Sequence, residues 1–280
     1  NKSDKFIRYW FNADENDPRH PQFPELRPQI YNHEAMPYEG CILGYFTVWQ
    51  GPENNVCDSL NIQKRNEVLI GWSKDGFHWN RENKKPFLPV SEDFHAWNAG
   101  NVQSTAGNPL IVGDSLYFYV SGRYNSKPKH DSNFATGLAM LRRDGFVSMR
   151  AGKKEGYVEV KTQIPANGNY LFVNADVKGT LAVEVLDDNG QPMEGFTKKD
   201  CISMKKSDKT KQIISWKKHP GVTSLVGKTV RLKFYLNQAD IYAFWISAWQ
   251  TGESGGYTGG GGPELSDKGI DTPMDKLKNN

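Results

Sequence analysis

The sequence has few of the residues that most often mark a metal or redox site. Its 280 residues include only three cysteines, Cys41, Cys57 and Cys201. Their spacing matches no metal-ligand or redox motif, and no phosphate-binding loop, zinc spacing or nucleophile elbow is present. We therefore expect no metal and no cofactor. Cys41 and Cys57 can pair if their segments are adjacent, and the odd count then leaves one thiol free.

Long apolar runs and a strong net charge are also missing. No apolar stretch approaches the roughly 20 residues that a membrane-spanning helix needs, and 35 basic residues stand against 32 acidic ones. Basic residues gather only at 198–218, where Lys alternates with Asp and Ser as on solvated strand edges. We therefore expect neither a membrane span nor a nucleic-acid partner. No signal peptide is visible, but the chain begins without Met, which fits a processed or cut chain.

Aromatic residues and glycines, in contrast, are abundant. The chain contains 8 Trp, 12 Tyr, 14 Phe and 27 Gly, a composition typical of many short strands joined by polar turns. Residues 1–37 are the exception. Five prolines lie between positions 18 and 37, and because proline disfavours helices and central strands, the sequence predicts a long loop there that leads into the first sheet.

Residues 38–150 predict two similar units of antiparallel strands. The expected strands are 39–50, 67–73, 77–79 and 87–90 in the first unit, and 101–104, 109–112, 115–121 and 136–142 in the second. Each unit contains an Asp-Gly-Phe turn, at Asp75 and at Asp144, which we interpret as structural. A repeat of roughly 55 residues is close to the length of a β-propeller blade.

The remainder of the chain has a different pattern. Residues 151–250 alternate apolar and polar side chains, which predicts an antiparallel β-sandwich. Residues 251–280 are first Gly-rich and then charged, which predicts a flexible tail. Because a propeller needs at least four blades to close, we expect an upstream segment or a partner chain to supply the blades that residues 38–150 lack.

Glu39 is the first candidate for chemistry, because it comes directly before the apolar run 41–49. A carboxylate at the entry of a central strand is desolvated, which raises its pKa and suits a general acid. Burial among Tyr38, Tyr45 and Trp97 would keep it protonated near neutral pH. The alternative is that Glu39 caps the strand or pairs with a Lys or Arg.

Several segments resemble a known group of enzymes. The motifs are AMPYEGCILGYFTVWQGPEN, WSKDGFHW, LYFYVSGR, GLAMLRRDGF and IYAFWIS. Across residues 10–262 the chain resembles the C-terminal part of the five-bladed propeller glycoside hydrolases, chiefly glycoside hydrolase family 32, with family 43 more distant. The resemblance implies the C-terminal blades of a five-bladed β-propeller followed by a β-sandwich, with a funnel-shaped site on the propeller axis.

The resemblance also implies three carboxylates, of which Glu39 occupies the place of the general acid, two blades ahead of the sandwich. The family motif there is Glu-Cys-Pro, whereas this chain has Glu39-Gly40-Cys41. The nucleophile and the stabilising Asp are expected upstream of residue 1, so this chain alone would be catalytically incomplete. Asp14 and Asp17 lie too close to Glu39 to be a blade away; at best they rim the funnel, and a turn or cap role is the alternative for Asp17.

Other residues are candidates for binding the substrate. His33 can hydrogen-bond a sugar hydroxyl or orient Glu39, or simply be solvated. Amide and aromatic side chains at the start of the second unit suit a neutral sugar, with strand capping and core packing as the alternative. With Asp14, His33 and Arg123, the candidate set is completed by Tyr38, Trp97, Asn98, Asn101 and Gln103. Arg123 rims the site if the substrate is acidic, or else lies at the surface.

The sequence thus favours a periplasmic or extracellular glycosidase that cleaves a plant, algal or microbial glycan. A non-catalytic glycan-binding protein on the same scaffold is the alternative, and a structural subunit that completes a propeller is a third hypothesis. Two carboxylates about 5 to 10 Å from Glu39 would favour the enzyme.

Overall fold

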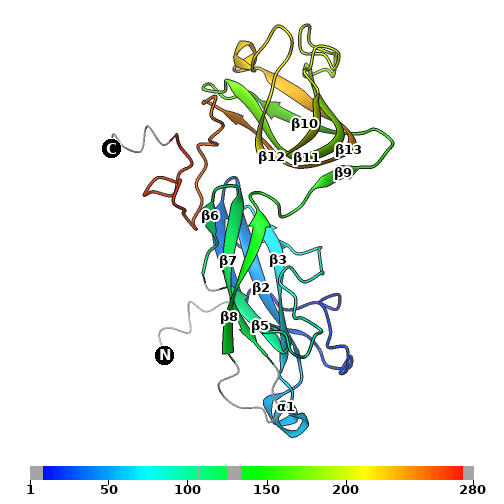
Figure 1. Cartoon of the computed structure of the whole chain (residues 1–280), viewed down its shortest axis with the longest axis vertical. Helices are drawn as coiled ribbons and strands as arrows, with labels where there is room; N and C mark the ends of the chain where they lie inside the picture. The colour runs from blue at the N-terminus through cyan, green and yellow to red at the C-terminus, as the bar shows by residue number, and fades with distance from the viewer. Residues whose placement is uncertain (1–8, 106, 125–133, 274–280) are drawn as a thin grey trace. The chain divides into compact units, whose positions relative to one another are not determined.

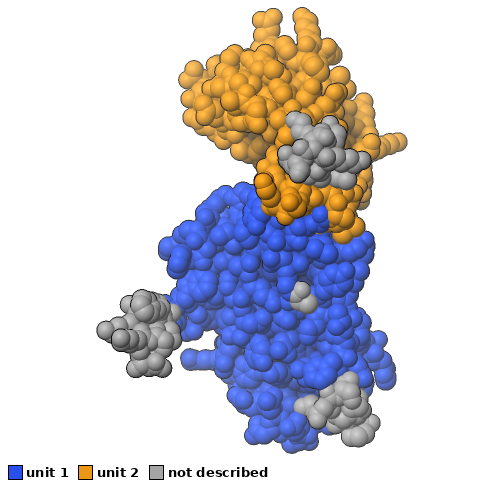
Figure 2. All heavy atoms as spheres, turned by 90° about the vertical axis from the view of Figure 1, so that its left-hand side faces the viewer, with its two compact units in different colours: residues 1–110, 117–140, 257–262 blue, residues 111–116, 141–256, 263–280 orange. Residues whose placement is uncertain are grey.

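The computed structural model describes residues 9–105, 107–124 and 134–273. Their regular structure is almost entirely antiparallel β-sheet, so the all-β prediction is confirmed (Figure 1). The chain divides into two compact units (Figure 2). Unit 1 comprises residues 1–110, 117–140 and 257–262, and unit 2 comprises residues 111–116, 141–256 and 263–280. No helix among the described residues is long and apolar enough to cross a membrane.

The first sheet, called sheet A, is a four-stranded meander. Its strands are β1 (Gln29–Tyr38), β2 (Cys41–Gly51), β3 (Arg65–Ser73) and β4 (Trp79–Asn80), in this spatial order. A short helix, α1 (Asn54–Leu60), connects β2 to β3. The central strand β2 is buried along nearly its whole length, as expected for a strand with neighbours on both sides and covered faces. All three cysteines are free thiols, so Cys41 and Cys57 do not pair.

The loop predicted for residues 1–37 is wrong in its last part, because Gln29–Tyr38 forms β1. Proline is tolerated here since β1 is an edge strand, which needs hydrogen bonds on one side only. Pro37 pairs with Ile42 in the ladder, and its carbonyl accepts the Gly259 N–H at 2.8 Å. The first strand of the meander therefore precedes the predicted one, and 39–40 becomes a hairpin turn.

The second sheet, called sheet B, agrees with the predicted strands within two or three residues. It contains β5 (Asn101–Thr105), β6 (Leu110–Val112), β7 (Ser115–Arg123) and β8 (Phe134–Arg142). Its order is β5-β7-β6, with β8 also paired to β7. Gly113 and Asp114 form the turn between β6 and β7, where Gly113 has a positive φ of 56°, which glycine adopts without steric cost.

The sheet of unit 2, called sheet C, is five-stranded. Its strands are β9 (Met149–Ala151), β10 (Gly156–Gln163), β11 (Tyr170–Leu186), β12 (Met204–Ile214) and β13 (Thr229–Ser247). The order is β10-β13-β11-β12, and β9 also pairs with β13. Register shifts near 174–175 and 177–180 interrupt the β11–β13 ladder; such bulges bend strands, and the sheet is strongly curved (Figure 1).

One apolar core fills unit 2. Val173, Val183 and Phe234 of sheet C belong to it, and Phe196 and Trp216 come from connecting segments. Trp216 is a core residue, and its Nε1 donates to the Val183 carbonyl at 3.0 Å. In a β-sandwich a second sheet would cover this core. Among the described residues, the core is covered instead by side chains from the segments that connect the strands of sheet C, such as Phe196 and Trp216.

The tail predicted for 251–280 is wrong for residues 251–273. Thr258 is buried and forms a β-bridge with Tyr38, while Asp271 is buried in an ion pair with Arg143 at 2.8 Å. Glycine is needed there for close approach rather than for flexibility, because a Cβ on Gly260 would overlap the Pro109 carbonyl oxygen. Residues 274–280 lie outside the described residues.

Candidate functional site

Glu39 lies in the two-residue turn between β1 and β2. It is exposed and has a φ of 51°, and its backbone N–H donates to the Tyr257 carbonyl at 2.9 Å. The predicted burial of Glu39 is therefore wrong, because the strand begins ten residues earlier and places position 39 at its far end. The desolvation that would favour a protonated Glu39 is absent.

Glu34, five residues earlier on β1, has the environment that was expected for Glu39. Its carboxylate accepts a hydrogen bond from the Thr105 hydroxyl of sheet B. Burial raises the pKa of the Glu34 carboxyl, and the hydrogen bonds from Thr105 offset only part of that rise. A half-buried carboxyl with a raised pKa is the state that a proton donor requires.

Polar groups from both sheets surround this carboxyl. Tyr45 lies opposite Glu34 in the β1–β2 ladder, and burial together with the Glu34 charge raises the pKa of its phenol. Neither the Tyr45 hydroxyl nor Asn32 Oδ1 has a hydrogen-bond partner among the described residues, although both are buried. Buried polar atoms are normally paired, so such atoms indicate space for a water or a ligand hydroxyl.

The interface between sheets A and B that contains Glu34, Tyr45 and Thr105 is called the polar layer below. Two predicted site residues, Asn101 and Gln103, belong to it. The Gln103 carbonyl accepts a hydrogen bond from Thr47 Oγ1 at 2.5 Å. Asn101 is buried, donates to the Lys64 carbonyl at 3.0 Å and accepts from Asn66 at 3.5 Å. The side-chain amide of Asn101 and the backbone carbonyl of Gln103 thus link sheet B to sheet A. This is a packing role, which was the alternative to substrate binding for both residues.

His33 points to the opposite face of sheet A from Glu34, since neighbours in a strand alternate. Its ring stacks on Phe46 at 4.3 Å and meets Trp79 edge-on at 4.7 Å. Burial and then the Arg81 charge lower the pKa of His33 to about 4. His33 is therefore neutral near pH 7, and its buried Nε2 has no partner among the described residues. It does not contact the exposed turn that holds Glu39.

The other predicted residues lie at the end of β1, in sheet B and in the segment that leads to sheet B. Tyr38 is buried at the end of β1. The Trp97 ring lies against Gly122 and Gly137, where a Cβ would overlap it. Asn98 donates to the Pro89 carbonyl at 3.1 Å, and the Arg123 guanidinium stacks over Phe134 at 4.2 Å. The structure therefore does not gather these residues around Glu39.

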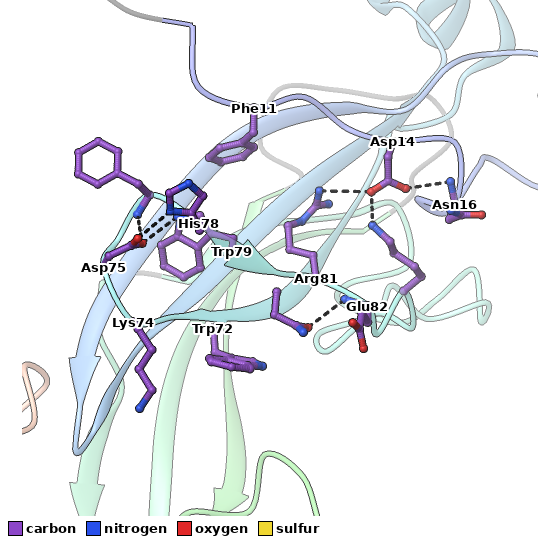
Figure 3. Close-up of a pocket in the computed structure, with 13 residues that line it drawn as sticks. Phe11, Asp14, Asn16, Trp72, Lys74, Asp75, His78, Trp79, Arg81 and Glu82 are labelled. Atoms are coloured by element: carbon purple, nitrogen blue, oxygen red, sulfur yellow. Dashed lines mark hydrogen bonds and ion pairs between the residues drawn. The ribbon is translucent and has the colours of Figure 1, made fainter.

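A groove of about 860 Å³ follows the free edge of sheet A at β4 (Figure 3). The side chains that line it are aromatic, charged or amide: Phe11, Asp14, Asn16, Trp72, Lys74, Asp75, Phe77, His78, Trp79, Asn80, Arg81, Glu82 and Lys84. Asp14, a predicted binding residue, is therefore at a groove, but at the outer edge of the sheet and away from the polar layer. This groove is called the edge groove below.

An ion network holds one end of the edge groove. Asp17 is fully buried and pairs with Arg81 at 2.7 Å and with Lys84 at 3.1 Å, so its role is structural. Burial acts to raise the pKa of Asp14, but hydrogen bonds from Lys84 and Asn16 and the charges of Lys84 and Arg81 outweigh it and lower that pKa. Arg81 and Lys84 both pair with Asp14, and Figure 3 shows Arg81 directed at the Asp14 carboxylate.

At the other end of the edge groove, Asp75 organises the turn that the sequence predicts. Its Oδ1 accepts the N–H groups of Phe77 and His78, both at 2.8 Å. Its Oδ2 lies 2.7 Å from His78 Nδ1. The hydrogen bonds from His78 and Phe77 hold the pKa of Asp75 well below its ordinary value. Asp75 is thus structural, as expected.

Comparison with family models, with curated proteins and with solved structures found no match for this chain. The described residues also contain no group of three or more His, Cys, Asp or Glu side chains that could hold a metal ion. The polar layer and the edge groove are therefore the features of the described residues that bear on function.

Sequence reasoning missed Glu34, Thr105 and Trp72 as candidates. One signal was present for Glu34. It lies in a series of every second residue, as expected for one face of a strand: Asn32, Glu34, Met36 and Tyr38. The prolines concealed this pattern. No local signal indicates that Thr105 meets Glu34, because the contact spans 71 positions of the chain.

Proposed function

We propose that the protein is a glycoside hydrolase in which Glu34, rather than Glu39, is the general acid. The observation that carries this proposal is the half-buried Glu34 carboxyl with a raised pKa beside Thr105 and Tyr45. Glycoside hydrolysis needs a protonated carboxyl next to the leaving oxygen. The unpaired hydroxyl of Tyr45 and amide oxygen of Asn32 are suitable partners for sugar hydroxyls.

The proposal includes the finer fold. Sheets A and B would be neighbouring blades of a five-bladed propeller, with β1 and β5 as innermost strands. Their packing supports this: Thr47 Oγ1 bonds to the Gln103 carbonyl, and the Tyr45 and Phe118 rings lie 5.8 Å apart across the interface. Further blades would come from the same protein or a second chain, unit 2 would correspond to the sandwich, and the location would be periplasmic or extracellular.

A non-catalytic glycan-binding protein is the second candidate. Hydrolysis uses two carboxyl groups, and among the described residues the hydrogen-bond partner of Glu34 is Thr105, not a second carboxyl group. A site with one carboxyl and several polar groups can bind a sugar without cleaving it.

The test compares Glu34→Gln with Glu39→Gln in the full-length protein. Reducing-sugar release from gluco-, xylo- and fructo-oligosaccharides is measured, together with 4-nitrophenolate release from the matching 4-nitrophenyl glycosides. We expect Glu34→Gln to lower oligosaccharide turnover by about 10² to 10⁴. The loss should be smaller with nitrophenyl glycosides, because nitrophenolate leaves without being protonated.

Glu39→Gln is the matched control, since it makes the same chemical change at the end of the same hairpin and should leave turnover unchanged. The reverse result would return the acid role to Glu39. A folded wild-type protein that binds these oligosaccharides without cleaving any of them would support the glycan-binding alternative.

A further inference from the structure

The edge groove is not explained by the polar layer. Glu34 and Tyr45 face sheet B, whereas His33 and Phe46 on the other face pack against Trp79, which lines the groove. The volume of about 860 Å³ lies within the range of small-ligand sites, roughly 300 to 1,000 Å³.

Aromatic rings form the apolar part of this groove and reach it from both faces of the sheet edge. Trp72 pairs with Asn80 in the β3–β4 ladder and lies on the face of sheet A that carries Tyr45. Trp79 lies on the opposite face, which carries Phe46. Trp72 is 47% exposed and Phe77 is 71% exposed. Large exposed aromatics grouped at one hollow indicate a binding surface rather than scattered surface residues.

The charges of the edge groove balance, which selects the class of ligand. Lys84 and Arg81 pair with Asp14 at one end. At the other end, the Asp75 carboxylate accepts backbone N–H groups of its own turn. The lining contains three carboxylates and three Lys or Arg side chains. An anion would meet the carboxylates and a cation the basic groups, so neither gains a net attraction. A neutral ligand rich in hydroxyl groups can use both kinds of charge as hydrogen-bond partners.

An extended peptide fits this edge less well, because strand addition needs a row of free backbone groups. The N–H groups of Phe77 and His78 before β4 bond to Asp75. The Glu82 N–H after β4 bonds to Asn80 Oδ1 at 3.3 Å. Side chains therefore occupy the donors on both sides of the two-residue strand.

We propose that the edge groove is a second carbohydrate site, which binds a segment of a neutral polysaccharide by stacking on Trp72 and Phe77. It shares a ligand class with the proposed function but none of its residues. Such a site would hold the protein on a glycan independently of cleavage at Glu34.

Affinity electrophoresis of the full-length protein tests the site, in native gels that contain xyloglucan, mixed-linkage β-glucan, galactomannan or arabinoxylan. We expect at least one of these neutral polysaccharides to retard the wild type. Trp72→Ala should lower the association constant about tenfold, equivalent to about 1.4 kcal/mol, and Phe77→Ala should also weaken it. Polygalacturonate, an anionic polysaccharide, should cause no retardation.

Tyr119→Ala is the matched control, because Tyr119 is an exposed aromatic of sheet B, 45% exposed, outside the groove. It should migrate as the wild type does, and circular dichroism should show all variants folded. Glu34→Gln should keep full retardation, so loss of cleavage and loss of this site are separable. Absence of retardation by every neutral polysaccharide, equal retardation of Trp72→Ala and wild type, or retardation by polygalacturonate alone would each overturn the proposal.

Discussion

The interiors of the two units are built from different residues. In unit 2 the core is a continuous set of apolar side chains, with Val183, Leu232 and Phe234 fully buried, and the buried ion pair of Arg143 with Asp271 lies outside that set. In unit 1, ionisable groups lie inside: Asp17 and Glu67 are buried. Burying a charge costs free energy unless it is paired, and both carboxylates are paired, Asp17 with Arg81 and Glu67 with Arg65.

This difference indicates a division of labour. An apolar core holds a sheet together without offering chemistry, whereas functional sites are built from ionisable and polar groups. Buried ion pairs also serve purely structural roles, so each group in unit 1 needs its own test. The predictions below ask whether stability in unit 2 rests on packing and in unit 1 on polar contacts.

The largest expected effect is in unit 2. Phe234→Ala removes a fully buried ring of β13 and should lower the free energy of unfolding of this unit by about 3 to 5 kcal/mol, through lost burial and a cavity. Urea denaturation followed by hydrogen exchange of unit 2 peptides measures it. Oligosaccharide turnover at temperatures where the variant is folded should not change, and a selective loss of turnover would break the division between the units.

The buried ion pair of unit 1 should come next. The Asp17 side chain is 0% exposed, so Asp17→Asn leaves the Arg81 guanidinium without its buried partner and should cost about 3 kcal/mol. Asp14→Asn is the control in the same network. Because the Asp14 side chain is 48% exposed, its loss should cost about 1 kcal/mol or less. Equal costs, measured by urea denaturation, would show that burial does not set the strength of this network.

Gly260→Ala tests the packing of residues 257–262 within unit 1. The added Cβ would overlap the Pro109 carbonyl oxygen, and overpacking of this kind costs about 1 to 3 kcal/mol. Limited proteolysis between 251 and 273 should become faster. Gly40→Ala is the control, since a Cβ there meets no atom within 4 Å. If both variants resist proteolysis as the wild type does, the segment does not depend on close approach.

Much of the fold could be predicted from sequence, where local pattern and structure agree. The strands of sheet B lie within two or three residues of those predicted for the second unit, and β11 and β13 lie in the region where alternating side chains predict strands. Prolines concealed β1, because proline excludes central strands but not an edge strand. The glycines of residues 251–273 led to the prediction of a flexible tail. Composition does not distinguish glycines that give a flexible backbone from glycines that allow two backbone segments to approach closely.

The candidate site was predicted less well, for a physical reason. The position predicted for Glu39 depended on the first strand beginning at residue 39. Because β1 precedes that residue and was not predicted, Glu39 lies in an exposed turn rather than at the entry of the first strand. Glu34 owes its raised pKa to burial between two sheets, and that burial depends on contacts such as Thr105, far along the chain. Local sequence reports strand faces, whereas the desolvation of a side chain is set by tertiary packing.

The smallest expected effect separates the two faces of β1 by their pH dependence. His33 has a folded pKa of about 4 against 6.5 when unfolded, so the unfolded chain binds more protons in this window and stability falls as pH drops from 6.5 towards 4. His33→Phe should reduce that fall. Glu34 is the opposite case: its folded pKa lies above the ordinary 4.5, so stability falls as pH rises through and above 4.5.

Glu34→Gln should accordingly raise the melting temperature of unit 1 at pH 7 and leave it unchanged below pH 4. Melting temperatures of wild type and both variants between about pH 3 and 8 measure the two slopes. Opposite slopes at adjacent residues would show that sheet A separates two environments, one facing the polar layer and one the aromatic cluster around Phe46. If both variants left the pH profile as it is in the wild type, neither side chain would be desolvated enough for the roles assigned to these faces.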